Sequence, residues 1–397
     1  MKKIAALVLL LSLLAGCGGA AGQPGAAVAK EPAAQVDERI TAAGTRFGID
    51  LLKQVYAAEK NSFLSPASAS LILSLTAAGA RGETLAEMLQ ALRYPDLPLE
   101  EIHRGNGALQ SILTNPDPQV EIALANAIWH RQDLQVAAAL AETARQHYGA
   151  QIEPAPFGRP EAVERINQWT AQATRGKISQ LLQSTEPTNV MILVNALYFK
   201  GAWTHPFDPQ RTADRPFTRF DGTRKQIPFM TQERNFAYLE GEGFQAVRLP
   251  YGQERVALYL FLPDDLSRFV AGLTAERWSE WMGSFTEQKG TLLMPRVRLE
   301  ATHLLNEPLQ RMGMVRAFGS ADFSGLFEGG QANPFIALVL QKSFLEINEQ
   351  GSEAAAATAV VLDESAGFNL TADRPFLIAI RDDQTGALLF IGTVVEP

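Results

Sequence analysis

The chain has 397 residues, of which 46% are hydrophobic and 20% charged, so it can bury a large core. Its 35 basic and 43 acidic residues give a net charge of −8, which argues against a nucleic-acid-binding protein because no basic excess is available to neutralise phosphates. None of the five histidines stands at metal-motif spacing to another histidine, to the cysteine or to a carboxylate cluster, so the sequence predicts no zinc site.

The first seventeen residues have the organisation of an export signal. Two lysines are followed by an apolar stretch, and Leu14-Ala15-Gly16-Cys17 closes it. This tetrapeptide resembles a bacterial lipobox, which implies cleavage before Cys17 and lipidation of its thiol; an ordinary secretory signal that contains a cysteine is the alternative. We therefore expect a signal peptide at 1–16, a flexible tether at 17–37, and an exported, disulfide-free protein. Acyl chains on Cys17 would hold it in the extracellular space at the cell envelope or cell surface.

Helices are predicted mainly in the first half of the body. Apolar residues recur at helical spacing over 38–55, and Ser65 is a plausible N-cap for a helix that begins with Pro66 and ends near Ala78. A short strand precedes that N-cap. Further helices are predicted at 84–92, 161–173 and 301–312.

Strands dominate the second half. The earliest are predicted at 120–129 and 190–199, and the later ones at about 226–230, 236–240, 244–250, 255–262, 291–300, 335–349, 376–381 and 387–395. Helices first and strands later indicate an α+β fold with large antiparallel sheets. Because no repeat appears and no linker interrupts the chain after residue 38, we expect one domain over 38–397.

The stretch 346–362 has the most unusual composition in the chain. It starts with alternating apolar and polar residues typical of a strand, passes Gly351, and carries almost no side-chain bulk from Ser352 to Thr358. Four consecutive alanines favour a helix, but the Val and Leu residues that follow prefer strands. Such a segment could slide between two existing strands without overpacking the core.

Short motifs along the chain point to one known family. They are Asn61-x-x-x-Ser65-Pro66-x-Ser68, Asn126-Ala127-Ile128-Trp129, Ile166-Asn167-Gln168-Trp169 with Gly176-Lys177-Ile178, Asn195-Ala196-Leu197-Tyr198-Phe199-Lys200-Gly201-x-Trp203, Phe229-Met230, Leu249-Pro250-Tyr251, Leu262-Pro263-Asp264, Met294-Pro295-Arg296, Met312-Gly313-Met314 with Ala321-Asp322-Phe323-Ser324, and Asp373-Arg374-Pro375-Phe376 with Phe390-Ile391-Gly392. In this order they resemble the motifs of the serpins, a family of serine protease inhibitors, and the resemblance covers essentially all of 40–397.

The resemblance implies a metastable α+β fold with a large antiparallel or mixed main sheet, smaller sheets, about eight or nine helices and an exposed reactive-centre loop at about 351–374. A target protease cleaves the loop and is held as an acyl-enzyme while the loop inserts as a new central strand. The protease is thereby carried to the opposite pole and distorted. The resemblance therefore implies an inhibitor rather than an enzyme, and we expect a monomer without a cofactor.

The small residues match the serpin hinge, where the loop enters the sheet. The hinge residues are Gly351, Ser352, Glu353, Ala354, Ala355, Ala356, Ala357 and Thr358. Since side chains alternate along a strand, Ser352, Ala354, Ala356 and Thr358 would face inward while Glu353 stays solvated. A charged or bulky inward residue would cost several kcal/mol, so this hinge favours inhibition over the non-inhibitory behaviour of relatives with larger hinge residues.

Further positions match the regions that control opening of the sheet. Glu349 and Arg296 match an acidic and basic pair at the loop's insertion point, beside Trp203; a surface pair worth ~0–1 kcal/mol is the alternative. Ser65, Ser68 and Asn195 match a buried cluster at the sheet centre. The family's usual histidine in that cluster falls on Gln341, which can donate and accept as histidine does but does not titrate.

The scissile bond follows from the family's usual hinge length. Counting from Gly351 places it between Ser365 and Ala366, with Glu364–Ser365 as the alternative. The first suits elastase-like or subtilisin-like serine proteases and the second glutamate-specific ones. Cleavage after Asp363, which would suit a cysteine protease, ranks third, and no Lys or Arg precedes Arg374 for a trypsin-like enzyme.

Two other functions remain as alternatives. An enzyme would need a catalytic constellation, but the sequence has no Gly-x-Ser-x-Gly, Gly-x-x-x-x-Gly-Lys or His-Glu-x-x-His motif. A non-inhibitory serpin that acts as a surface binding or chaperone-like protein is the stronger rival.

Overall fold

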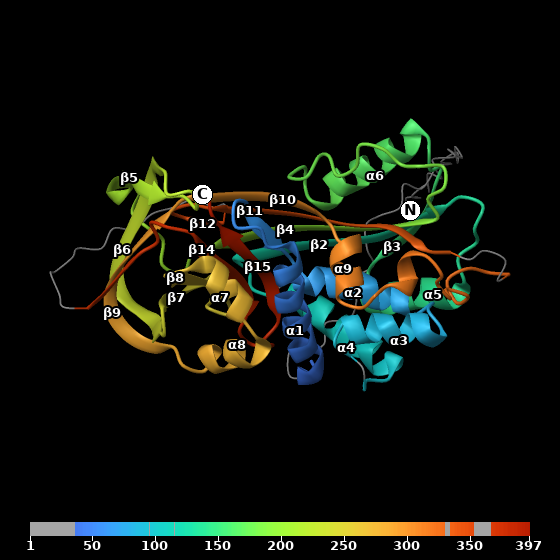
Figure 1. Ribbon diagram of the computed structural model, residues 1–397, viewed down its shortest axis with the longest axis horizontal. Coiled ribbons are helices and arrows are strands. Elements are labelled where there is room, and N and C mark those ends of the chain that lie inside the picture. Colours follow the sequence, from blue (N-terminus) through green and yellow to red (C-terminus); the bar gives the residue numbers. More distant parts are fainter. Residues whose placement is uncertain (1–35, 95, 115, 330–333, 353–366) are drawn as a thin grey trace, which may run out of the picture.

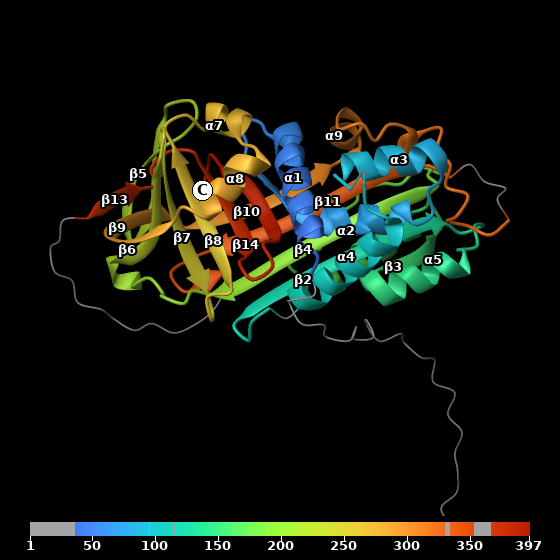
Figure 2. The ribbon, with the colours of Figure 1, turned by 90° about the horizontal axis from the view of Figure 1, so that it is seen from below.

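The computed structural model describes residues 36–94, 96–114, 116–329, 334–352 and 367–397. A six-stranded sheet lies between helix α6 on one face and a layer of helices on the other, and a nine-stranded sheet forms the opposite half of the molecule (Figure 1). Seen from below, the strands of the six-stranded sheet run along the long axis of the molecule (Figure 2). The expected α+β architecture is confirmed.

The described helices are α1 (Glu38–Val55), α2 (Pro66–Ala77), α3 (Gly82–Ala91), α4 (Leu99–Thr114), α5 (Ala138–Thr143), α6 (Pro160–Ala173), α7 (Leu266–Gly272), α8 (Ala275–Met282) and α9 (Asn306–Arg311). A π-helical turn, η2 (Ala144–Tyr148), and two 3-10 turns, η3 (Pro209–Arg211) and η4 (Arg316–Phe318), accompany them. Within this part of the chain, none of the helices combines the length and apolar character needed to cross a membrane.

The described strands are β1 (Ser62–Leu64), β2 (Val120–Arg131), β3 (Gln151–Ala155), β4 (Met191–Ala202), β5 (Ala213–Thr218), β6 (Arg224–Gly241), β7 (Phe244–Tyr251), β8 (Val256–Pro263), β9 (Thr286–Pro295), β10 (Val297–Leu304), β11 (Ile336–Ile347), β12 (Gly351–Ser352), β13 (Phe368–Thr371), β14 (Phe376–Asp382) and β15 (Leu388–Val394). The nine-stranded sheet has the order β1-β15-β14-β8-β7-β6-β9-β13, with β5 paired to β6. The six-stranded sheet has the order β10-β11-β4-β2-β3, with β12 paired to β4.

Three sequence-based assignments are wrong. The predicted strand at 291–300 is two strands, because β9 ends at Pro295 in the nine-stranded sheet and β10 begins at Val297 in the six-stranded sheet. The predicted helix at 301–312 begins only at Asn306, because the preceding residues pair with β11 down to Leu304↔Leu340. Asn306 fixes this boundary by donating to the Ala337 carbonyl and accepting from the Val339 N–H, at 2.7 and 2.9 Å. The predicted strands at 226–230 and 236–240 are one continuous strand, β6, because β9 pairs along both parts.

Helix α4 was not predicted because Gly105 and Gly107 lower its helix propensity. Both glycines are needed for close packing. A Cβ on Gly105 would lie 2.6 Å from Ile40 of α1, and one on Gly107 would lie 3.2 Å from the backbone of His147 in η2. The elements α5, β3, β5, α7, α8 and β13 were also missed.

The two faces of the six-stranded sheet are both buried. Residues Met191, Leu193 and Leu197 of β4 belong to the main core that β4 shares with α2, while Ile192 and Val194 pack against Ala162 and Ile166 of α6. Helix α2 is buried along its whole length and is capped by the Ser65 hydroxyl, which accepts from the Ser68 N–H at 3.2 Å. A strand buried on both faces reads as a continuous apolar run, which is how β4 was recognised.

A buried polar contact joins α4 to η2. His103 is 5% exposed, and its Nδ1 is hydrogen-bonded to the Tyr148 hydroxyl at 2.7 Å. Burial, helped by the nearby His147, lowers the pKa of His103 to about 4, although Glu100 opposes the shift. The folded state therefore favours the neutral imidazole of His103.

Acid should destabilise the protein through His103. The folded-state pKa lies below the unfolded value, so this group's stabilisation is complete above pH 6.5 and is lost as the pH falls towards 4. The free energy of unfolding should fall by about 3 kcal/mol between pH 7 and pH 4. The measurement is the first transition of urea-induced unfolding at the two pH values. His103→Gln, which does not titrate, should remove this part of the shift; an unchanged pH dependence in the variant would contradict the assignment.

Candidate functional site

The six-stranded sheet contains a parallel seam, defined here as the boundary between β4 and β11. These strands pair in parallel from Ile336↔Met191 to Phe344↔Tyr198, whereas β4 is antiparallel to β2 and β11 is antiparallel to β10. Pairing across the seam stops at Tyr198 and Phe344, although β4 continues to Ala202 and β11 to Ile347. A strand inserted there could run antiparallel to both neighbours and satisfy both sets of backbone groups.

The start of such a strand is already in place. After β11 the chain turns at 348–351, and β12 pairs antiparallel with β4 at Gly351↔Ala202 and Ser352↔Gly201. Because β2 already occupies the other edge of β4 at Gly201, β12 lies on the edge that faces β11. The seam is therefore open at this end, and β12 fills its first two positions.

Gly351 and Ser352 suit this position for different reasons. Gly351 has φ +131°, and a Cβ there would lie 2.1 Å from the Gly201 carbonyl oxygen, so only glycine fits. Ser352 is 1% exposed, and its hydroxyl lies 3.2 Å from that of Tyr251. The other hinge positions (Glu353 to Thr358), both proposed scissile bonds (Glu364 to Ala366) and Cys17 lie outside the described residues.

Glu349 and Arg296 form an ion pair at the open end of the seam. The Arg296 Nη2 and Nε lie 2.6 and 2.9 Å from Glu349 Oε1, and the Thr212 hydroxyl donates to the same oxygen at 2.6 Å. The Glu349 side chain is 7% exposed against 48% for Arg296. Burial alone would raise the pKa of Glu349, but the hydrogen bonds from Arg296 and Thr212 outweigh it and hold the pKa below its usual value. The pair thus has one buried member, unlike a purely exposed surface pair.

Trp203 holds the turn that leads into β12. Its indole Nε1 donates to the Asn348 carbonyl at 2.9 Å, and its backbone N–H donates to the Gln350 carbonyl at 3.0 Å. The indole stacks on Tyr251, with ring centroids 4.3 Å apart. Glu349, Arg296 and Trp203 therefore come together where the chain enters the seam.

A buried polar cluster bridges the middle of the seam. Gln341 of β11 donates through Nε2 to Asn195 Oδ1 of β4 at 2.6 Å and to the Ser65 carbonyl at 2.9 Å. Its Oε1 accepts from the Ser65 N–H at 2.9 Å. Asn195 in turn donates to the Ser68 hydroxyl. Ser65, Ser68, Asn195 and Gln341 are at most 1% exposed, so these bonds are shielded from bulk solvent.

Sequence reasoning missed one member of this cluster. Asn126 lies in β2 directly opposite Asn195, is 5% exposed, and accepts from Asn195 Nδ2 at 2.5 Å. The signal was present in the sequence, because an asparagine within an apolar strand needs a buried partner. Thr212 was also missed, and nothing in its local sequence marks it.

Replacing Gln341 with the isosteric Met should weaken the seam. The Ser65 N–H, the Ser65 carbonyl and Asn195 Oδ1 would each lose a partner, at a cost on the order of 3 kcal/mol in the first urea-unfolding transition. Gln341→His, which keeps a donor and an acceptor, is the control and should retain most of the stability. Equal losses in the two variants would show that shape, and not hydrogen bonding, matters at this position.

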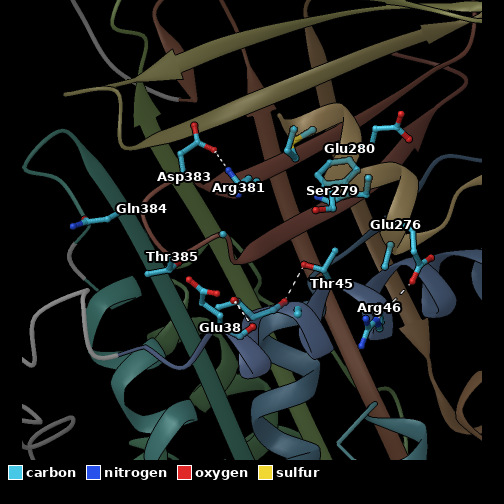
Figure 3. Close-up of a pocket in the computed structure, with 16 residues that line it drawn as sticks. Glu38, Thr45, Arg46, Glu276, Ser279, Glu280, Arg381, Asp383, Gln384 and Thr385 are labelled. Carbon is cyan, nitrogen blue, oxygen red and sulfur yellow. Dashed lines mark hydrogen bonds and ion pairs between the residues drawn. The ribbon is translucent and has the colours of Figure 1, made fainter. Parts of the chain in front are cut away.

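A large surface hollow lies elsewhere. It measures about 720 Å³ and lies between α1, α8 and the turn after β14, as Figure 3 shows. Arg46 lies 4.0 Å from Glu276 across it, and Arg381 pairs with Asp383. None of the residues that line it belongs to β4, β11 or β12.

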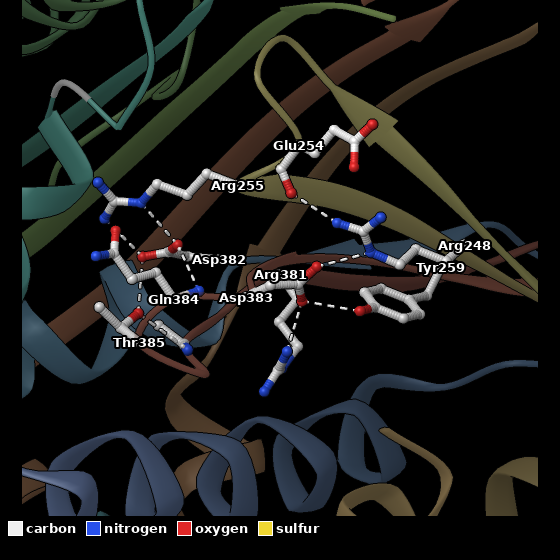
Figure 4. Close-up of polar contacts among 10 residues, drawn as sticks. Arg248, Glu254, Arg255, Tyr259, Arg381, Asp382, Asp383, Gln384 and Thr385 are labelled. Carbon is white, nitrogen blue, oxygen red and sulfur yellow. Dashed lines mark hydrogen bonds and ion pairs between the residues drawn. The ribbon is translucent and has the colours of Figure 1, made fainter. Parts of the chain in front are cut away.

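Besides the Arg381–Asp383 pair, two further arginine–aspartate pairs hold the turn beside this hollow (Figure 4). Arg255 makes a bidentate contact with the fully buried Asp382, with both distances 2.9 Å. Arg248 and Tyr259 both donate to Asp383 at 2.8 Å. Since both carboxylates are occupied by donors, this arrangement stabilises the β14–β15 turn. No group of three or more His, Cys, Asp or Glu side chains in the described part of the chain is placed to hold a metal ion.

Comparison with known proteins gives consistent matches. A family model described as Serpin (serine protease inhibitor) matches residues 42–397. Human Serpin B8 is 35% identical over 382 residues, which cover 91% of this chain and 100% of that protein. Human leukocyte elastase inhibitor is 33% identical over 387 residues with the same coverage.

Solved structures agree with these matches. The native state of tengpin, a thermophilic serpin, is similar with a TM-score of 0.86 and 29% identity, covering 94% of this chain and 98% of that chain. Human thyroxine-binding globulin in complex with its ligand has a TM-score of 0.85 and 28% identity, covering 91% of this chain and 99% of that chain.

Proposed function

Because this chain belongs to the serpin family and has the serpin fold, we propose that it is an exported, lipid-anchored suicide inhibitor of serine proteases. The observation that carries the proposal is β12, which occupies the first two positions of an otherwise closed parallel seam. The inhibitor acts as a monomer and needs no cofactor, because the loop itself supplies the new strand.

The register of β12 assigns a partner to each residue of the inserted loop. Continuing from Ser352↔Gly201, one residue forward on the loop moves one residue back on β4, so Leu362 reaches Met191 at the far end. The segment 351–362 therefore matches β4 in length. At ~3.3 Å per residue it carries an acyl-enzyme roughly 40 Å from its docking point.

The same register explains the small inward side chains. After insertion, Ala354 and Ala356 would face the core opposite Phe199 and Leu197, which are 1% exposed and leave no room for bulk. Thr358 arrives between Asn195 and Gln341, where its hydroxyl can replace the hydrogen bond that insertion breaks. A dozen residues that gain ladder bonds at ~0.5–1.5 kcal/mol each supply on the order of ten kcal/mol.

The other end of the loop is anchored independently. β13 pairs in parallel with β9 over Phe368–Thr371, on the nine-stranded sheet. Cleavage at Ser365–Ala366, or at Glu364–Ser365, therefore frees the upstream arm for insertion while the downstream arm stays in place.

The target class follows from the residues beside the proposed bond. Ser365 suits elastase-like or subtilisin-like proteases, and Glu364 suits glutamate-specific ones; a cysteine protease that cleaves after Asp363 is a weaker candidate. One similar protein is named leukocyte elastase inhibitor, which is consistent with the first choice. The rival function, a non-inhibitory binding or chaperone-like protein, has a counterpart in thyroxine-binding globulin. The small inward hinge residues favour inhibition.

Mixing the protein with elastase, subtilisin and a glutamate-specific protease should give an SDS-resistant complex with at least one of them, at near-equal stoichiometry. Thr358→Arg should convert the protein into a substrate that is cleaved without trapping, because a guanidinium cannot be buried between Asn195 and Gln341. Glu353→Arg, on the solvated face, is the matched control and should still trap. Simple turnover by every protease would sink the inhibitory proposal, and mass spectrometry of the released C-terminal peptide identifies the bond.

Lipidation is tested separately. When the full chain is produced in a bacterial host with radiolabelled palmitate, the wild type should incorporate label and partition into Triton X-114. Cys17→Ser should do neither, because the thiol is the acylation site. Label in the Cys17→Ser protein, or no label in the wild type, would refute the anchor and leave the inhibitory proposal intact.

A further inference from the structure

A segment that follows α6 crosses the seam on the face opposite α2. We call residues 174–182 the crossing segment. Its Ile178 packs on Ala196 and Tyr198 of β4 and on Phe344 of β11, and the Gln180 carbonyl accepts from Lys342 Nζ of β11 at 2.8 Å. The Thr174 hydroxyl fixes the start of the turn by accepting from the Ile178 N–H at 3.1 Å. The crossing segment thus contacts both strands that must separate.

Lys177 of the crossing segment places one cation over two rings that belong to different strands. Its Nζ lies 5.9 Å from the ring centroid of Tyr198 and 5.9 Å from that of Phe344. These residues are direct partners across the seam, their centroids are 6.4 Å apart, and they are 3% and 4% exposed. A cation within about 6 Å of a ring face is attracted by the ring quadrupole.

Insertion of the loop would break this shared contact. In the register set by β12, Ala355 passes between Tyr198 and Phe344, and a new strand moves its neighbours apart by about 4.8 Å. The centroids would then lie roughly 11 Å apart. If Nζ keeps its present height above the line that joins the centroids, it would then lie roughly 7.5 Å from each ring, beyond the ~6 Å range of the attraction.

We propose that Lys177 is a positioning residue that holds the seam closed, so that its shared contact with Tyr198 and Phe344 limits the rate of strand insertion. This inference deepens the proposed inhibitory function and rests on the same seam. Arg298 provides an internal comparison, because it lies over Phe344 alone at 5.7 Å. Arg298 belongs to β10, on the same side of the seam as Phe344, and would move with that ring.

The experiment measures opening of the seam without a protease. A synthetic peptide with the sequence 351–362 is incubated with the intact protein, and its incorporation rate is followed by native electrophoresis and by the rise in Tm. Lys177→Met should accelerate incorporation about fivefold, since one cation shared by two rings is lost. Lys177→Arg should behave like the wild type. Arg298→Met should change the rate by less than about twofold, although it also removes a cation over an aromatic ring.

A double-variant cycle gives a second measurement. In a Tyr198→Leu background the two sides are no longer joined, so Lys177→Met should bring no further acceleration. Equal acceleration by Lys177→Met and Arg298→Met, an unchanged rate in Lys177→Met, or no peptide incorporation by the wild type would each overturn the inference. This assay contains no protease. If the Lys177→Met protein incorporates the peptide faster as expected, the inference about Lys177 therefore stands even if the protein fails to trap a protease.

Discussion

The parallel pairing of β4 with β11 is the constraint on which the rest of the structure depends. Only between parallel strands can a single new strand be antiparallel to both neighbours, so insertion there exchanges one parallel ladder of backbone hydrogen bonds for two antiparallel ladders. The turn after β11 directs the chain back into this boundary, and Gly351 allows it because no side chain fits against the Gly201 carbonyl. The proposed function is therefore a consequence of strand direction before it is a consequence of any side chain.

Three contacts of different chemistry lie along the seam. At its open end the buried Glu349 is held by Arg296 and Thr212. Next comes the aromatic pair Tyr198–Phe344, with Lys177 over both rings, and at the centre is the fully buried Asn195–Gln341 bond. In the proposed insertion, an advancing strand would meet them in this order. Each contact is polar or cationic, which makes it directional and lost over a small displacement, unlike apolar packing.

The replacement of histidine by glutamine at the centre changes the character of the last contact. Gln341 uses both its carbonyl and its amide, and it satisfies the Ser65 backbone as well as Asn195. Since an amide does not titrate, the strength of this contact is independent of pH across the physiological range. Acid sensitivity in the described fold comes instead from other groups, among them His103, which joins α4 to η2 on the helical side of the molecule.

Part of this structure can be predicted from the sequence, and part is decided only by tertiary packing. The difference between the two parts has a physical basis. Local patterns were sufficient for the buried strand β4 and for the N-cap Ser65 and Pro66 of α2, because each depends on neighbouring residues alone. The tertiary structure decided where α9 begins, since pairing with β11 overrides the helical preference of 301–304. Tertiary packing also explains the two glycines of α4, because Ile40 and His147 approach them closely. Above all, it brought Lys177, Tyr198 and Phe344 together from three distant segments, and no local pattern encodes a contact made by packing one layer onto another.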